Sequence, residues 1–152
     1  MNIKVFVILP MAVAASACFP NVQTKVTPLD PSSHLMRTCP NGVKLYTTPE
    51  RVEQPYHEVA LLNSTGEVHY SDEGEMFASM RAEAAEAGAN GIILDDIEEP
   101  NAITIVAADV AKTGVVRKGK AMAIYVAADS ANSVAACANY KAPSWLRRHL
   151  WP

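Results

Sequence analysis

The histidine and cysteine side chains of this 152-residue chain are the groups that could carry out catalysis or hold a metal, and their spacing favours neither. None of the histidines has a second ligand at the helical or hairpin spacing that a zinc site needs. The chain has no G-x-S-x-G nucleophile turn and no Gly-rich phosphate loop. We therefore expect no enzyme activity, no cofactor and no metal site. The histidines are His34, His57, His69 and His149.

Two short stretches could still assemble a hydrolytic pair. His57 is followed directly by Glu58, and His69 lies three residues before Asp72. A carboxylate beside a histidine can support general-base catalysis, but polar pairs near a turn more often form a solvated surface. A hydrolase is thus our third hypothesis. It requires a deep pocket that joins one of these histidines to a carboxylate.

Charged residues gather in two further stretches. The acidic stretch from Asp95 to Glu99 lacks the alternating ligands and central glycine of an EF-hand calcium loop, so we interpret it as a solvated turn that ends at Pro100. The stretch Lys112–Lys120 is basic, and we interpret it as a hairpin loop. This loop could contact anionic lipid headgroups, or it could be a solvated hairpin end. The residues concerned are Asp95, Asp96, Glu98 and Glu99 in the first stretch, and Arg117, Lys118 and Lys120 in the second.

Residues 1–17 have the pattern of a secretory signal peptide. Lys4 supplies the positive start, and the apolar run from Val5 to Ala15 is too short to span a bilayer. Small residues then precede the expected cleavage point. Cleavage removes Lys4 and no acid, so the formal charge changes from −3 to −4. This charge gives no reason to expect nucleic-acid binding.

Cys18 follows directly after the small residues. The run Ala15-Ser16-Ala17-Cys18 resembles a bacterial lipobox, in which the cysteine is acylated with palmitate-type chains and becomes the new N-terminus. The same residues also satisfy an ordinary cleavage site, and that alternative stays open. The resemblance implies two or three acyl chains, which anchor a protein stably where a single chain is marginal. Phe19 after the cysteine, in place of Asp, implies delivery to the periplasmic side of the outer membrane.

The number of cysteines bears on the same question. The chain has three. If Cys18 carries lipid, Cys39 and Cys137 remain, and an oxidising compartment lets them pair. If it does not, one thiol is left over, which is unusual in a secreted protein. We therefore predict lipid attachment at Cys18 and a disulfide bond between Cys39 and Cys137.

The stretch from Ser71 to Ile97 predicts the centre of the fold. Asp72 and Glu75 have the spacing of a helix capping box, and Gly88 lies where a left-handed residue should end the helix. The apolar run 92–94 then predicts a buried strand. The apolar face expected for this helix consists of Met76, Met80, Ala84 and Ala87.

Alternating apolar residues predict further strands on both sides of this stretch. We expect them at Val43–Thr47 and Tyr56–Asn63 before the helix, and at Ile103–Ala108 and Ala121–Val126, paired as a hairpin, after it. The fold class is therefore α+β, with one main helix packed on a small mixed sheet of four or five strands.

The run MFASMRAEAAEAGANGIIL, preceded by PYHEVALLNSTGEV, resembles a segment of small bacterial envelope domains. These are the RcsF-like stress-sensor lipoproteins and the YbjQ-like family. The resemblance covers roughly Val43 to Val126. It implies a helix packed on a small sheet and a role in signalling by contact, and it supplies no catalytic residue.

These observations divide the chain into four parts. We expect a signal peptide at 1–17, the lipidated cysteine with a flexible Pro-containing tether at 18–38, the α+β domain at 39–138, and an aromatic and basic tail at 139–152. The tail could be an amphipathic motif that contacts a partner or the membrane surface, could fold back on the sheet, or could fray. Its candidate contact residues are Trp145, Arg147, Arg148 and Trp151.

The function expected from the sequence is that of a non-enzymatic lipoprotein facing the periplasm. It would act by protein contact, as a sensor, adaptor or envelope-assembly accessory. Its expected partners are the membrane, through Cys18, and another envelope protein, with no nucleic acid. The alternative is a small-molecule or metal-binding oligomeric domain, since fold does not fix function.

Overall fold

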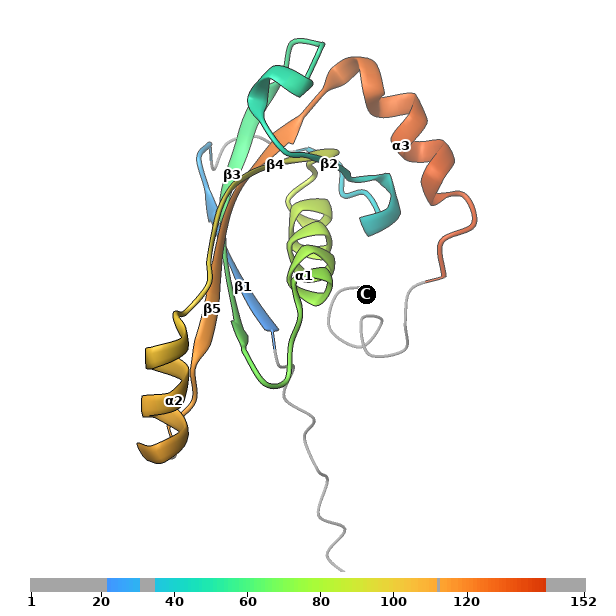
Figure 1. The fold of residues 1–152 in the computed structure, drawn as a ribbon. Helices are drawn as coiled ribbons and strands as arrows, with labels where there is room; N and C mark the ends of the chain where they lie inside the picture. The colour runs from blue at the N-terminus through green and yellow to red at the C-terminus, as the bar shows by residue number, and fades with distance from the viewer. Residues whose placement is uncertain (1–21, 31–34, 112, 142–152) are drawn as a thin grey trace, which may run out of the picture.

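The computed structural model describes residues 22–30, 35–111 and 113–141, and the α+β class is confirmed. Five strands form one mixed sheet in the order β1-β3-β5-β4-β2 (Figure 1). The strands are β1 Val22–Pro28, β2 Lys44–Tyr46, β3 His57–Glu67, β4 Gly91–Glu98 and β5 Val116–Tyr125. The helices are α1 Glu73–Glu86, α2 Ala102–Ala111 and α3 Ser130–Cys137, with short 3-10 turns η1 Pro40–Gly42, η2 Pro49–Arg51 and η3 Ala127–Asp129.

Strand β5, the last of the described strands in sequence order, lies at the centre of the sheet. It pairs antiparallel with β3 on one side and with β4 on the other. Strand β1 is antiparallel to β3 at one edge, and the short β2 is parallel to β4 at the opposite edge. The helix α1 therefore joins two strands, β3 and β4, that run in the same direction but are separated by β5.

Helix α1 begins and ends where the sequence predicts. The Glu75 backbone N–H donates to Asp72 Oδ1 at 2.8 Å, and the Asp72 N–H donates to Glu75 Oε2 at 3.3 Å, which completes the capping box. Gly88 has φ +82°, the left-handed conformation that ends a helix at low cost only for glycine. A Cβ there would also lie 2.5 Å from Leu35 Cβ.

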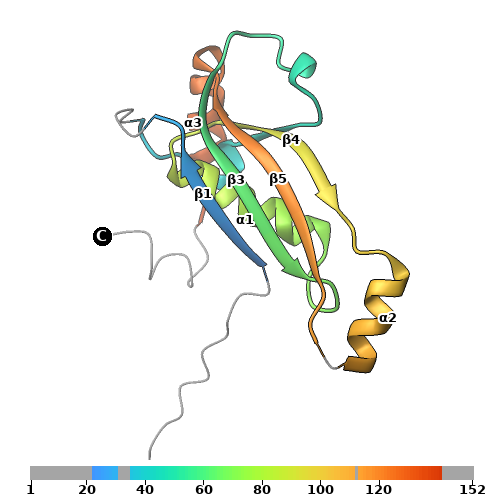
Figure 2. The same ribbon diagram turned by 90° about the vertical axis from the view of Figure 1, so that its left-hand side faces the viewer.

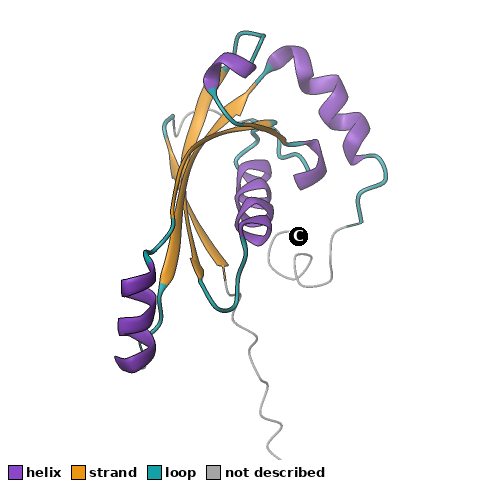
Figure 3. Cartoon of the chain, in the orientation of Figure 1, coloured by secondary structure: helices purple, strands orange, loops and turns teal. Residues whose placement is uncertain are grey.

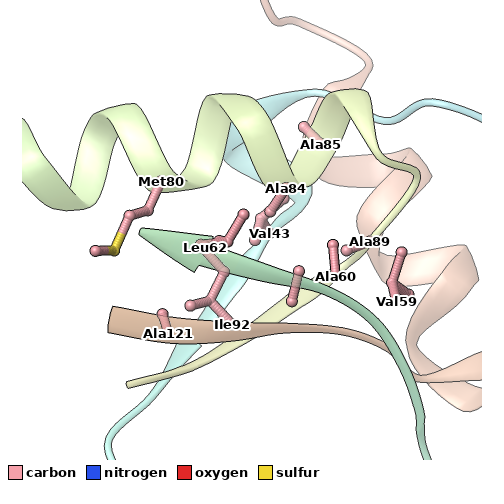
Figure 4. Close-up of a cluster of buried hydrophobic side chains, with 11 residues drawn as sticks. Val43, Val59, Ala60, Leu62, Met80, Ala84, Ala85, Ala89, Ile92 and Ala121 are labelled. Atoms are coloured by element: carbon pink, nitrogen blue, oxygen red, sulfur yellow. The ribbon is translucent and has the colours of Figure 1, made fainter. Parts of the chain in front are cut away.

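The main core lies between α1 and the concave face of the sheet (Figures 3 and 4). Met76, Met80 and Ala84 of α1 are fully buried, as expected, while Ala87 is only partly buried. Leu62 and Ile92 face them from β3 and β4. Small residues allow the helix to approach closely: a Cβ on Gly119 of β5 would come within 2.9 Å of Met80 Cε.

Buried Asn90 joins the turn after α1 to the end of β5. Its side-chain amide donates to the Val126 carbonyl at 2.8 Å, and its side-chain carbonyl accepts from the Val126 N–H at 2.7 Å. Its backbone N–H donates to Ile124 O at 3.1 Å, and its backbone carbonyl accepts from Lys44 N at 3.0 Å. One asparagine thus satisfies backbone groups of two strands that lie far apart in sequence.

The tether predicted at 18–38 is wrong over most of its described length. Residues Val22–Pro28 form strand β1, which is in register with β3 from Val22↔Gly66 to Pro28↔Ala60. Further on, Thr38 N donates to Ala85 O at 3.0 Å, so this segment packs along α1. The folded domain therefore extends back to at least Val22 and does not begin at Cys39.

The strand predicted at Ile103–Ala108 is also wrong, because these residues belong to α2. Its alternating Ile and Ala residues fit a strand, but Asn101 begins a helix instead. The Asn101 side-chain oxygen accepts from Thr104 N at 2.8 Å and from Thr104 Oγ1 at 2.9 Å. The hairpin partner expected at Ala121–Val126 lies mostly in β5, which pairs with β3 and β4.

Candidate functional site

The disulfide predicted between Cys39 and Cys137 is confirmed, with the two Cα atoms 5.7 Å apart. It joins η1 to α3, a helix that the sequence analysis did not predict. Close contacts surround it, because Ser133 Oγ donates to Gly42 O at 2.8 Å and a Cβ on Gly42 would lie 2.9 Å from Ser133 O. The bond thus fastens the η1 segment, which packs on α1, to helix α3, which follows β5 in the chain.

The position of Val22, at the start of β1, shows which end of the sheet lies nearest in sequence to Cys18. Cys18 itself lies outside the described residues, as do the tail residues Trp145, Arg147, Arg148 and Trp151. Val22, four positions after Cys18, pairs with Gly66, and Gly66 pairs with Arg117. The chain therefore enters the sheet at the end where β3 finishes and β5 starts (Figures 1 and 2).

The two described histidines do not form the pairs that the sequence left open. His57 is exposed at the start of β3. His69 Nε2 lies 3.2 Å from Asp109 Oδ1 of α2, so His69 contacts the carboxylate of Asp109 and not that of Asp72. Within residues 22–30, 35–111 and 113–141, no three His, Cys, Asp or Glu side chains gather as a metal site.

The acidic stretch lies mostly in β4 and the basic stretch partly in β5, and these two strands pair antiparallel with each other. The solvated turn predicted for Asp95–Glu99 is wrong up to Glu98, which ends β4, and the basic loop predicted at Lys112–Lys120 is wrong from Val116 onward, which lies in β5. Glu98 is in register with Lys118, and Lys120 Nζ lies 3.8 Å from Glu98 Oε1. The charge complementarity of the two stretches was the sequence signal that could have revealed their pairing.

Arg117 links three elements at this end of the sheet. Its guanidinium forms an ion pair with Glu99 and donates to the Ser71 carbonyl at 3.0 Å, just before α1. The hydrogen bond to Glu99 raises the pKa of Arg117. These bonds tie the start of β5 to the β3–α1 turn.

A second polar cluster holds the opposite end of the sheet. Lys44 Nζ of β2 lies 2.9 Å from Asp129 Oδ2, and the Tyr46 hydroxyl donates to the same oxygen at 3.3 Å. The hydrogen bond from Lys44 lowers the pKa of Asp129, and the same bond raises the pKa of Lys44. This cluster positions the start of α3 against the edge of the sheet.

A shallow cleft of about 430 Å³ lies on the sheet face opposite α1. Side chains alternate along β5, so Met122 points away from the helix-facing Ala121 and Ala123. Leu61, 40% exposed, contributes to the apolar floor. Neither described histidine lines the cleft. The residues with titratable side chains that line the cleft are Tyr56, Glu58, Asp95 and Lys120.

Comparisons with known proteins identify no family for this chain. No family model matches it, and no curated protein matches it. Among solved structures, it is similar to the crystal structure of a Francisella virulence factor, FvfA, in its orthorhombic form. The match has 15% sequence identity and a TM-score of 0.48, and it covers 67% of this chain and 96% of that chain. In the described part of the chain, no helix has the length and apolar character needed to span a bilayer.

Proposed function

We propose that this chain is a lipid-anchored, non-enzymatic protein on the periplasmic side of the outer membrane, acting by contact with other envelope proteins as a sensor, adaptor or assembly accessory. The observation that supports the proposal is the pairing of Cys39 with Cys137. It consumes two of the three cysteines and leaves Cys18, at the end of a lipobox-like run, as the unpaired one.

Strand β1 adds a geometric consequence. Four residues of chain, even when fully extended, reach at most about 14 Å, so an acylated Cys18 would hold the start of β1 close to the bilayer. A contact partner would then have to be a membrane neighbour or a protein that approaches the membrane. This differs from a domain that searches for partners on a long tether.

Intact mass under non-reducing conditions, on protein extracted from membranes of its own host, tests the anchor. We expect the mass of residues 18–152 plus acyl chains, less two protons for the disulfide. A Cys18→Ser variant should lose the acyl mass and leave the membrane fraction. A wild-type mass without lipid contradicts the proposal.

Photo-crosslinking in the envelope tests the contact role. A crosslinking residue at Leu61, in the exposed cleft, should give a discrete adduct with an envelope protein, whereas one at Met36, 90% exposed and absent from the cleft lining, serves as the control. Identical adduct patterns at both positions would indicate random collisions and contradict a contact surface there.

A small-molecule or metal-binding oligomer is the second candidate, and the cleft of about 430 Å³ is the observation that favours it. Native mass spectrometry separates the two functions. A ring-shaped oligomer that retains a bound small molecule or metal supports this candidate, and a ligand-free monomer supports the contact role.

A further inference from the structure

Helix α2 presents its apolar residues to solvent, the reverse of an ordinary surface helix. None of its residues is buried, and Ile103, Val106 and Val110 are 81%, 63% and 81% exposed. Their spacing of three and four places them on one face of the helix. Residues Ile105 and Ala108, on the opposite side, are the two that are partly covered.

The polar groups of α2 are already satisfied away from this face. Asn101 accepts two hydrogen bonds from Thr104 at the start of the helix. Asp109 is the single charged residue of α2, and it lies 3.2 Å from His69 on the β3–α1 turn. The outward face consequently offers apolar side chains without a charge among them.

Helix α2 lies at the end of the sheet where the described chain begins. It follows β4 and precedes β5, and it projects past the ends of β1 and β3 at the end of the sheet where the chain enters at Val22 (Figures 1 and 2). The same end carries Tyr70, which is 64% exposed on the β3–α1 turn. Tyrosine is a residue enriched where protein meets the membrane interface.

We infer that α2 is a second membrane contact, whose outward apolar face inserts into the lipid surface that holds the Cys18 acyl chains. The inference rests on the proposed anchor, because a Cys18 within about 14 Å of Val22 brings this end of the sheet to the bilayer. Together, the lipid and the helix would fix the orientation of the domain, with the η2 end of the sheet farthest from the membrane.

The charges at this end favour apolar insertion over headgroup attraction. Among the described residues at this end of the sheet, acidic Asp72, Glu99 and Asp109 accompany basic Arg117 and Lys118, so these residues form no basic patch beside α2. Membrane binding by buried apolar area does not require anionic lipid, whereas binding by basic residues weakens with salt. The contact should therefore form equally well on zwitterionic phosphatidylethanolamine vesicles and be insensitive to salt.

A depth measurement on the acylated protein tests the inference. With Cys18 acylated and Cys39 paired, Val106→Cys introduces one free thiol for a nitroxide label, and Glu53→Cys on the far side of η2 provides the control. In phosphatidylethanolamine vesicles, we expect the label at 106 to gain accessibility to lipid-soluble oxygen and lose accessibility to a water-soluble nickel chelate. The label at 53 should remain accessible to the chelate.

Partitioning of the unacylated protein provides a second measurement. In the Cys18→Ser background, Ile103→Gln, Val106→Gln and Val110→Gln together should lower vesicle partitioning by roughly tenfold or more, because apolar area drives it. The matched control Thr104→Gln, exposed on the flank of α2, should leave it unchanged. Equal partitioning of the triple variant and the control contradicts membrane contact by this face.

Three other results overturn the inference. A label at 106 that stays water-accessible in vesicles rejects insertion, and shielding without vesicles that rises with protein concentration identifies a second copy as the occupant. Shielding without vesicles that disappears when residues 142–152 are removed identifies the C-terminal tail. The mass of the same sample separates the two proposals: an acylated protein with an exposed label refutes the inference alone, and an unacylated protein refutes the anchor.

Discussion

Helix α1 is the more charged of the two long helices and yet has buried residues, whereas the more apolar helix α2 has none. Helix α1 carries five charged residues in fourteen, yet Met76, Met80, Ala84 and Ala85 are buried beneath it. Helix α2 has one charged residue in ten and no buried residue. The difference shows that the location of an apolar side chain in the fold, rather than its number in the sequence, decides whether it stabilises the folded domain.

We expect the largest effect from the Cys39–Cys137 disulfide, which joins the η1 segment packed on α1 to helix α3. Replacing both cysteines with Ser (Cys39→Ser, Cys137→Ser) opens a loop with a sequence separation of 98 residues. On the chain-entropy model, this should lower the free energy of unfolding by about 4 kcal/mol, a large part of a typical domain's stability. Chemical denaturation of the variant measures the loss.

Reduction of the wild type should give the same loss as the double variant, and reductant should leave the variant unchanged. If the wild type and the variant unfold at the same denaturant concentration under oxidising conditions, the disulfide does not stabilise the η1 segment that packs on α1. The contrast between a strongly stabilised region around α1 and an exposed α2 is then weakened.

Met80→Ala should cost about 3 kcal/mol. The side chain is fully buried between α1 and the sheet, and its methyl group lies against Gly119, so truncation leaves a cavity that neighbouring rigid strands cannot fill. Met36→Ala is the matched control, because Met36 is 90% exposed and its removal should change stability by less than about 0.5 kcal/mol. Similar losses in both variants would mean that the core under α1 is loosely packed.

Asn90→Ala should lower the free energy of unfolding by about 2 kcal/mol. The substitution leaves the Val126 N–H and carbonyl without their side-chain partner in a buried site. Hydrogen exchange at Val126 should accelerate more than exchange at Thr104 in α2, which is bonded to Asn101. Equal acceleration at the Val126 and Thr104 amides would instead indicate global unfolding without a local role for the asparagine.

The features of α1 were predictable because they depend on residues close together in sequence. The Asp72–Glu75 capping box, the Met76 and Met80 face and the left-handed Gly88 all follow local rules. Strand β1 had a readable signal as well, since Val22, Thr24 and Val26 alternate with exposed residues, but the neighbouring prolines favoured a tether.

The features that the sequence did not predict depend on distant pairing. The central place of β5 requires it to pair with β3 and β4 together, and no local pattern specifies that order. In α2, Ile103 and Ile105 fit a strand as well as a helix, and the Asn101 cap was the overlooked local evidence. The cleft beside Leu61 likewise exists only once three strands are assembled.

The smallest expected effect gives the sharpest test of the comparison. Substituting Ile103, Val106 and Val110 together with Gln removes three apolar side chains, but all three are exposed, and Gln is a good helix former. The free energy of unfolding in solution should therefore change by less than about 0.5 kcal/mol, and solubility should rise. Denaturant unfolding of the unacylated Cys18→Ser protein, with and without the three substitutions, provides the measurement. A loss of about 2 kcal/mol or more would mean that the folded chain itself covers this face, and would place α2 in the same class as α1.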